Sequence, residues 1–254
     1  MLITCENASF GYDGRAVIKA LSFSVEHSDY LWVVGENGAG KTTLIRGFLR
    51  LLNPLKGNIT FCEGLSRGKI GYLSQQPELK KDFPADVFEV VLSGNLGSMG
   101  LRPIYTAKEK ARAATAMERL GIIDLKKEFY RELSGGQQQR VLLARAFCAA
   151  QVDLSGDNGD ASHRLLVLDE PAAGLDPLIT AELYDLLKKL NHEIGISIIM
   201  VSHDIRGIGQ YAKHILHIEN SYGVLTETAA YINSEKGRKF LGLENEGAPG
   251  EAKK

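Results

Sequence analysis

Cysteine is scarce in this sequence, and its pattern excludes two classes of small domain. The chain has three cysteines, an odd number, at the widely spaced positions Cys5, Cys62 and Cys148. This spacing matches neither a disulfide framework nor a zinc motif, so it indicates a reducing compartment. We therefore expect all three thiols to be small apolar side chains buried in the core.

The sequence also lacks an excess of charge of either sign and any long apolar run. Thirty lysines and arginines balance 31 acidic residues, which gives no electrostatic reason for nucleic acid as the main partner. Apolar runs such as residues 196–200 are far too short to span a bilayer, and residues 1–10 lack the basic leader of a signal peptide. We expect a cytosolic protein that reaches a membrane only through a partner.

The chain is long enough for a packed core. Its 254 residues, 44% hydrophobic and 24% charged, fit a globular protein of one large domain or two small ones. Residues 2–14 alternate and then turn, which predicts an edge strand with a hairpin. The apolar residues 31–34 predict a strand that leads into a glycine loop, the spacing after Thr42 is helical, and residues 69–75 predict another strand.

The rest of the sequence indicates an α/β core with an insertion. Ala, Leu, Glu and Lys dominate from about residue 84 to 150, with helical periodicity in 107–122, which predicts a helix-rich insert. Two apolar strands, 164–170 and 196–203, flank a helical stretch, the pattern of a crossover in a parallel sheet. The Asp-, Ser- and Gly-rich segment 152–163 is expected to be an exposed loop, and the tail 244–254 to be disordered.

The stretch GENGAGKT, residues 35–42, is a phosphate-loop pattern with a predicted strand before it and a predicted helix after it. Its glycines let successive backbone N–H groups point at phosphate oxygens. Lys41 would bridge the β and γ phosphates, and the Thr42 hydroxyl would bind Mg²⁺. The sequence therefore predicts nucleotide binding.

The apolar strand LLVLDE, residues 165–170, ends in two carboxylates. Ligands of open α/β sheets lie beyond the carboxyl ends of the strands, so these acids would face the nucleotide. Asp169 suits a Mg²⁺ shell, and Glu170 could orient or deprotonate the attacking water. His203 and Gln75 end two further strands at this edge, where they could contact the γ-phosphate and bind Mg²⁺ or water.

A second helix start suited to an anion lies at LSGGQQQR, residues 133–140. A serine and two glycines before a helix leave N–H groups at a positive dipole end, although a simple helix cap is the alternative. With GENGAGKTT, YLSQ, LLVLDEP, AAGLD and VSHD, this stretch makes the chain resemble the ATP-binding subunit of an ABC transporter. The resemblance runs from FGYDG, residues 10–14, to VSHD, residues 201–204.

The resemblance implies an α/β fold, a P-loop NTPase core with a mainly parallel sheet. It also implies an antiparallel β subdomain near the N-terminus and an inserted helical subdomain at about residues 80–150. All of these would belong to one ATPase domain of residues 1–235, whose core is residues 1–75 and 160–235.

The resemblance also implies roles for individual residues. Tyr12 would stack on adenine, Glu170 would be the catalytic base, Gln75 the Q-loop residue and His203 the switch histidine. ATP would contact Tyr12, Gly35, Asn37, Gly38, Gly40, Lys41, Thr42, Thr43, Ser134, Gly135, Gly136, Gln137 and Asp176. The Mg²⁺ of MgATP would be held by Thr42, Gln75 and Asp169.

The family works as a head-to-tail dimer, which would explain the second anion site. ATP lies between the phosphate loop of one copy and LSGGQ of the other, and hydrolysis opens the pair. Asp176 would belong to the loop that crosses this interface. The second copy would be the same chain or a paralogue. Further partners would be an integral-membrane permease, on whose cytoplasmic face the chain would lie, and an extracytoplasmic metal-binding protein.

Residues 80–100, KKDFPADVFEVVLSGNLGSMG, resemble subunits of zinc and manganese uptake systems. We therefore expect import of one of these metals. Iron-chelate or cobalamin import is the nearest alternative, and a soluble ABC ATPase such as an iron–sulfur assembly scaffold stays open. The cargo would pass through the permease, so no metal-ligand cluster is expected in this chain.

Two features depart from the family pattern. Glu36 stands where the family often has proline, and its side chain can point outward. The segment 152–163 is longer than usual. A cation could bind its polar side chains, although a solvated loop is preferred; these are Asp153, Asp157, Asp160 and His163.

Overall fold

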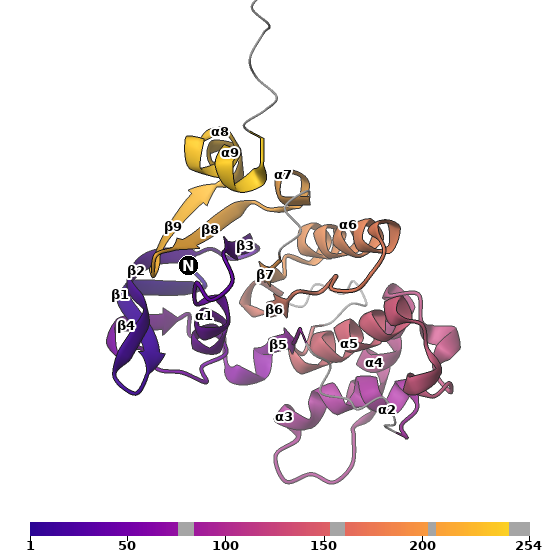
Figure 1. The fold of residues 1–254 in the computed structure, drawn as a ribbon. Coiled ribbons are helices and arrows are strands. Elements are labelled where there is room, and N and C mark those ends of the chain that lie inside the picture. Colours follow the sequence, from indigo (N-terminus) through magenta and orange to yellow (C-terminus); the bar gives the residue numbers. More distant parts are fainter. Residues whose placement is uncertain (76–83, 153–160, 203–206, 244–254) are drawn as a thin grey trace, which may run out of the picture.

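A six-stranded sheet forms the centre of the computed structural model (Figure 1). The structure describes residues 1–75, 84–152, 161–202 and 207–243. The strand order is β5-β6-β7-β3-β8-β9, and neighbours are parallel except for β9, which is antiparallel to β8. The strands are β3 (Tyr30–Gly35), β5 (Ile70–Leu73), β6 (Leu165–Asp169), β7 (Ser197–Val201), β8 (His214–Glu219) and β9 (Tyr222–Glu227).

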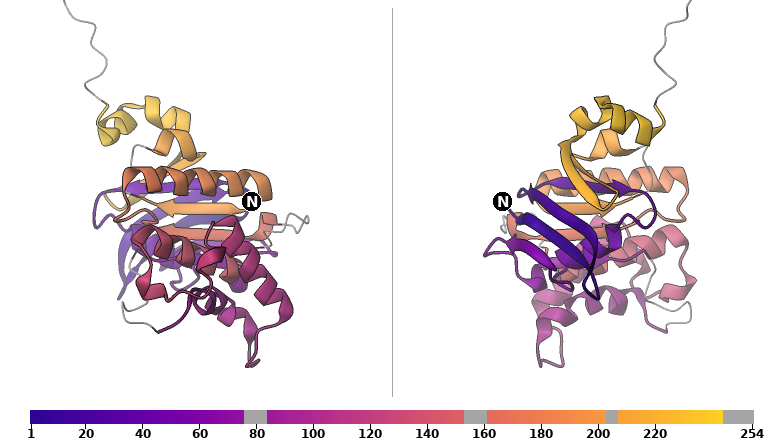
Figure 2. Two further views of the ribbon diagram at one scale, coloured as in Figure 1. Left: turned by 90° about the vertical axis from the view of Figure 1, so that its right-hand side faces the viewer. Right: turned by 60° about the vertical axis from the view of Figure 1, so that its left-hand side comes forward.

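The central strands are buried along their whole length because both faces of the sheet are covered. Alternate residues of β3 enter two different cores. Trp32 packs with Tyr184 of α6 at a ring-centroid distance of 5.5 Å, whereas Leu31 belongs to the core that contains α1. Figure 2 shows α6 (Pro177–Ile194) along one face of the strands. This arrangement fixes the carboxyl edge of the sheet, where β3 and β6 end.

A smaller antiparallel sheet made by the N-terminal part of the chain has the order β2-β1-β4. Its strands are β1 (Ile3–Tyr12), β2 (Arg15–Val25) and β4 (Lys56–Phe61). The prediction of an edge strand at residues 2–14 is therefore wrong: β1 is the middle strand, because β4 pairs with its second side. Helix α1 (Lys41–Phe48) contacts β1 and β3 and so joins the two sheets.

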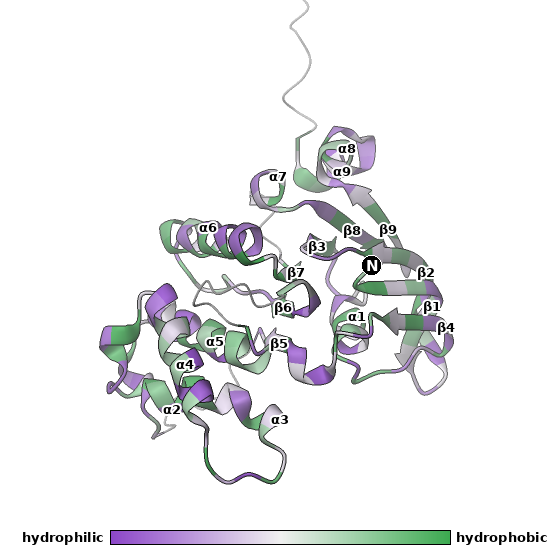
Figure 3. Cartoon of the chain, turned by 180° about the vertical axis from the view of Figure 1, so that it is seen from behind, coloured by the Kyte–Doolittle hydropathy of each residue, from purple (hydrophilic) through white to green (hydrophobic). Residues whose placement is uncertain are grey.

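Several helices of the inserted segment pack against one another beside β5 (Figure 1). They are α2 (Val87–Leu92), α3 (Leu96–Met99), α4 (Ala107–Arg119) and α5 (Gly135–Ala149). Helix α4 begins with a reciprocal cap, in which Thr106 Oγ1 accepts a hydrogen bond from the Glu109 backbone and Glu109 Oε2 accepts one from the Thr106 backbone. In Figure 3, α6 carries hydrophobic and hydrophilic residues on different sides, as a helix packed on a core requires.

The C-terminal part of the described chain contains α7 (Ile208–Tyr211), α8 (Thr228–Asn233) and α9 (Glu235–Leu241). Short 3₁₀ helices are η1 (Arg67–Lys69), η2 (Ser93–Asn95), η3 (Ile123–Leu125), η4 (Tyr130–Glu132) and η5 (Ala161–His163). Within the described ranges, no helix combines the length and the apolar character that crossing a bilayer would require.

The predicted α/β fold is confirmed: a mainly parallel sheet, a small antiparallel sheet and inserted helices are all present. The prediction that all three thiols are buried is wrong. Cys5 and Cys148 are buried, but Cys62 is only half-buried. The segment 152–163 is not exposed throughout, because Val152 and Ala161 lie in the core. Its middle, with Asp153, Asp157 and Asp160, lies outside the described residues, as does the tail from residue 244.

Candidate nucleotide site

The glycine-rich loop folds around the side chain of its own lysine. Strand β3 is buried to its last residue, Gly35, and α1 starts at Lys41. Lys41 Nζ donates hydrogen bonds to the carbonyl oxygens of Gly35 at 2.8 Å and of Glu36 at 2.9 Å. The ammonium group is thus fixed above the loop whose backbone N–H groups would face phosphates.

Two glycines in this loop cannot be replaced without strain. Gly40 has a φ of 105°, and a Cβ there would lie 2.7 Å from Ile18 Cγ1 and 3.0 Å from Val17 Cγ1. Gly35 has a φ of 151°, and a Cβ there would collide with the carbonyl oxygen of Ile218. The loop therefore depends on the left-handed backbone that glycine adopts at little cost.

Lys41 and two acidic residues face each other across a cavity. Burial lowers the pKa of Lys41, and the negative charges of Glu170 and Asp169 act in the opposite direction. Both Lys41 and Asp169 are less than a tenth exposed. A buried cation beside carboxylates is an arrangement suited to polyphosphate and a divalent metal, which would balance these charges.

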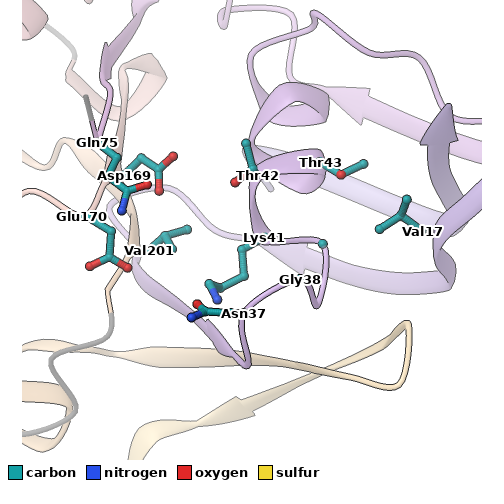
Figure 4. A pocket seen from close by; sticks show the side chains of 11 residues that line it. Val17, Asn37, Gly38, Lys41, Thr42, Thr43, Gln75, Asp169, Glu170 and Val201 are labelled. Atoms are coloured by element: carbon teal, nitrogen blue, oxygen red, sulfur yellow. The ribbon is translucent and has the colours of Figure 1, made fainter. Parts of the chain in front are cut away.

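The cavity has a volume of about 260 Å³ and opens beyond the carboxyl ends of β3 and β6. Figure 4 shows Gln75, Asp169 and Glu170 on one side and Lys41 and Thr42 on the other. The predicted residues that it brings together are Asn37, Gly38, Gly40, Lys41, Thr42, Thr43, Gln75, Asp169 and Glu170. Thr42, Gln75 and Asp169 offer hydroxyl, amide and carboxylate oxygens, the donor types that Mg²⁺ prefers.

Two apolar residues that sequence reasoning missed also line the cavity. Val17 comes from β2 and Val201 ends β7. Val17 belongs to no motif, and Val201 is the apolar first residue of VSHD, which was given no role in the site. Tertiary packing alone places them there.

Glu170 has an unusual backbone conformation. Its φ is 52°, the left-handed region that non-glycine residues rarely adopt, and its amide donates a hydrogen bond to the Val201 carbonyl at 2.9 Å. The strand β6 ends at Asp169, so the chain turns sharply at Glu170. Backbone strain of this kind gathers at functional sites, where it aims a side chain.

Tyr12 does not line the cavity. It ends β1, is 40% exposed, and its hydroxyl accepts a hydrogen bond from Arg46 Nη1 at 2.9 Å. The Arg46 guanidinium also lies over the tyrosine ring, 5.6 Å from its centroid. The Tyr12 ring is therefore partly exposed on the surface beside α1, apart from the residues that line the cavity.

The stretch LSGGQ also lies apart from this cavity. Ser134 is the N-cap of α5: its Oγ accepts a hydrogen bond from the Gln137 amide at 3.3 Å, and Gln137 Oε1 accepts one from the Ser134 amide at 2.9 Å. Ser134 and Gly135 are exposed, whereas Gly136 packs on Ile179 of α6. The helix cap weighed as the alternative is thus present, and the first turn of α5 still presents its N–H groups at the surface.

A hydrogen bond connects α5, the helix that LSGGQ begins, to the acidic edge of the cavity. Gln139 Nε2 donates a hydrogen bond to the carbonyl of Pro171, the residue after Glu170. Asp176 is the exposed N-cap of α6, and its Oδ1 accepts hydrogen bonds from the Leu178 and Ile179 amides. His203, the predicted switch histidine, lies outside the described residues.

The family model described as ABC transporter matches residues 18–173. The chain is 31% identical over 220 residues to the zinc transport system ATP-binding protein AdcC of Streptococcus pneumoniae, covering 85% of this chain and 89% of AdcC. It is 34% identical over 219 residues to the manganese transport system ATP-binding protein MntB of Bacillus subtilis (84% and 82%). It is also 34% identical over 242 residues to the phosphonates import ATP-binding protein PhnC of Staphylococcus epidermidis (88% and 87%).

The fold of this chain is also similar to that of a solved structure. A transporter described as of the metal-chelate type, in an inward-facing conformation, superposes with a TM-score of 0.80 at 25% identity. The match covers 95% of this chain and 89% of that one.

Proposed function

Because the chain belongs to the ABC transporter family, it is an ATPase subunit of an import system, and we propose that its cargo is zinc or manganese. The observation that carries this proposal is the identity of 31% to a zinc transport subunit and 34% to a manganese transport subunit over more than four fifths of each chain. The resemblance of residues 80–100 to such subunits supports it, and of these, residues 84–100 lie within the described structure.

Glu170 would act as the base for ATP hydrolysis. Its carboxylate lines the cavity opposite Lys41 and would accept the proton of the water that attacks the γ-phosphate. Lys41 would hold the β and γ phosphates, as would the amides of the loop at residues 35–42.

Bound Mg²⁺ would offset the charge of the phosphate oxygens, and Thr42, Gln75 and Asp169 would hold it. His203 would contact the γ-phosphate, and Tyr12 would stack on adenine.

The complete site would require a second copy of the chain. Ser134, Gly135, Gly136 and Gln137 do not line the cavity that contains Lys41, and the first two are exposed. In a head-to-tail homodimer, these residues of one copy would bind the γ-phosphate held by the other, and Asp176 would lie at the interface. Residues 1–235 would act as one ATPase unit in this assembly.

The remaining partners would be a separate membrane permease and an extracytoplasmic metal-binding protein. The chain would lie on the cytoplasmic face of the membrane, attached to the permease. Pulling down the protein from detergent-solubilised membranes tests this: a multi-span permease should accompany it. Its repeated absence would instead favour a soluble ABC ATPase without a transport partner.

Metal uptake by cells tests the cargo most directly. Cells that lack the gene should lose uptake of radioactive zinc or manganese, and the wild-type gene should restore it. Glu170→Gln should fail to restore it, because removing a general base costs roughly 10²- to 10⁴-fold in rate. Glu118→Gln, at an exposed position on α4, should restore it fully.

A metal chelate is the second candidate cargo, because the solved transporter of metal-chelate type superposes on nearly the whole chain. The phosphonate import subunit is as similar to the chain as the manganese one, so phosphonate belongs in the same assay. Normal uptake of free zinc and manganese in the deleted cells, with loss of ferric-chelate or phosphonate uptake, would overturn the proposed cargo.

A further inference from the structure

Three side chains with metal-binding chemistry meet at a place remote from the nucleotide cavity. His27 lies in the turn between β2 and β3, Cys62 directly follows β4, and His163 ends η5. One donor atom from each, imidazole nitrogen or thiol sulfur, lies within 4.8 Å of the other two, and all three residues are half-buried. Residue spacing did not predict this cluster, because its three members lie far apart in sequence.

Gly64 has no side chain and so leaves space for the imidazole of His163. A Cβ on Gly64, two residues after Cys62, would collide with the imidazole ring of His163. The rings of His27 and His163 lie with their centroids 5.0 Å apart at an angle of 66°. Gly64 thus provides the space in which His163 reaches the other two donors.

We propose that His27, Cys62 and His163 form a binding site for Zn²⁺. Two imidazoles and one thiolate are ligands that zinc prefers, and they exclude hard cations such as Mg²⁺. In a tetrahedral site with Zn–N of about 2.0–2.1 Å and Zn–S of about 2.3 Å, donor atoms lie roughly 3.3–3.6 Å apart. Small rotations of the three side chains would shorten the distances between their donor atoms from at most 4.8 Å to this range. A fourth coordination position would remain for water.

Cys62 differs from the other two cysteines in its surroundings. Cys5 and Cys148 are buried, and burial raises the pKa of each thiol to about 12, so neither supplies a thiolate near neutral pH. Cys62 is only half-buried, and the Arg50 guanidinium, which stacks on Phe61, lies near it.

The site would connect parts of the chain that are far apart in sequence. His163 precedes β6, whereas Cys62 follows the last strand of the small antiparallel sheet. A bound ion would fix the end of segment 152–163 to that sheet. The site lies at the amino end of β6 and Asp169 at its carboxyl end, roughly 15 Å apart at the usual rise per strand residue. It is therefore separate from the nucleotide site and does not depend on which cargo is transported.

Cobalt substitution tests the site in the full-length protein. Protein from which transition metals have been removed is saturated with MgADP and then titrated with Co²⁺. We expect one equivalent to give a thiolate-to-cobalt charge-transfer band and the strong visible bands of tetrahedral cobalt, and Zn²⁺ to displace it. Cys62→Ser should lose the charge-transfer band, and His163→Ala and Gly64→Ala should weaken zinc binding at least about 10-fold. His192→Ala, at an exposed histidine on α6, is the matched control and should bind as wild type does.

Unchanged MgADP affinity by calorimetry establishes that each variant is folded. The absence of a charge-transfer band in the wild type, or its persistence in Cys62→Ser, would overturn the proposal. Zinc should also raise the thermal unfolding midpoint of the wild type but not of Cys62→Ser. Equal stabilisation of both proteins would place the metal on other residues and would equally overturn it.

Discussion

Lys41 Nζ lies 2.8 Å from the carbonyl oxygen of Gly35, so the lysine side chain connects the two ends of the glycine-rich loop. The two partners lie six positions apart in sequence, and the second acceptor is the carbonyl of Glu36. The ammonium group is thus already positioned within the cavity, across from Asp169 and Glu170 (Figure 4). A polyphosphate would therefore bind to a lysine side chain that is already positioned, so binding would cost less side-chain entropy.

Lys41→Ala is expected to weaken ATP binding by the isolated subunit. Loss of a charge-assisted hydrogen bond costs about 1.5–3 kcal/mol, which corresponds to about a 10- to 150-fold lower affinity. Titration calorimetry measures it. Lys188→Ala, which removes a lysine from the exposed surface of α6, is the control and should bind normally. Unchanged affinity in Lys41→Ala would contradict the role given to this residue.

Gly40→Ala is expected to distort the loop. The added methyl group would press on Ile18 and Val17, and alanine is strained at a φ of 105°. We expect a loss of about 1–3 kcal/mol in the free energy of unfolding and a lower nucleotide affinity. Urea denaturation and calorimetry measure the two effects. Gly97→Ala, in α3, where the added group meets no other part of the fold, should lower neither the free energy of unfolding nor the nucleotide affinity.

Acid should remove a stabilising contact in the helical insert. A hydrogen bond from Arg102, followed by one from the Thr106 backbone, lowers the pKa of Glu109 to about 2 from its ordinary value of 4.5. Because the pKa is lower in the folded state, this contribution is complete above pH 4.5 and is lost as the pH falls toward 2. Glu109→Gln should therefore be less stable than the wild type at neutral pH.

The stability difference between Glu109→Gln and the wild type should shrink as the pH falls. Urea denaturation of both proteins from neutral pH to about pH 3 gives the difference in the free energy of unfolding. A difference that stays constant over this range would show that the charge of Glu109 contributes nothing.

The local motifs predicted which residues gather at one edge of the sheet, because each motif consists of neighbours in sequence. GENGAGKT and LLVLDE placed Lys41, Thr42, Asp169 and Glu170 around one cavity. Contacts between distant segments could not be found in this way. Val17 lines the cavity but carries no motif, β1 is a middle strand only through its pairing with β4, and Cys62 meets two histidines far from it in sequence. Such contacts depend on the tertiary fold, which residue spacing does not encode.

Ser134→Arg is expected to abolish ATP turnover without weakening ATP binding to the monomer. Ser134 is exposed and lies outside the cavity of its own chain, so a large cation there should block the second copy while leaving Lys41 and its loop intact. Steady-state ATPase assays and calorimetry on the same preparation measure both properties. Lost ATP binding by the monomer would mean that LSGGQ acts within its own chain.

The ATP-dependent association of Glu170→Gln tests the two-copy site most directly. Without the base, bound ATP should persist between the copies, so sedimentation velocity should show a monomer without nucleotide and a dimer with MgATP. The double variant Glu170→Gln/Ser134→Arg should bind ATP and stay monomeric. If Glu170→Gln binds ATP and remains a monomer at every concentration, the paired half-sites of this account are contradicted.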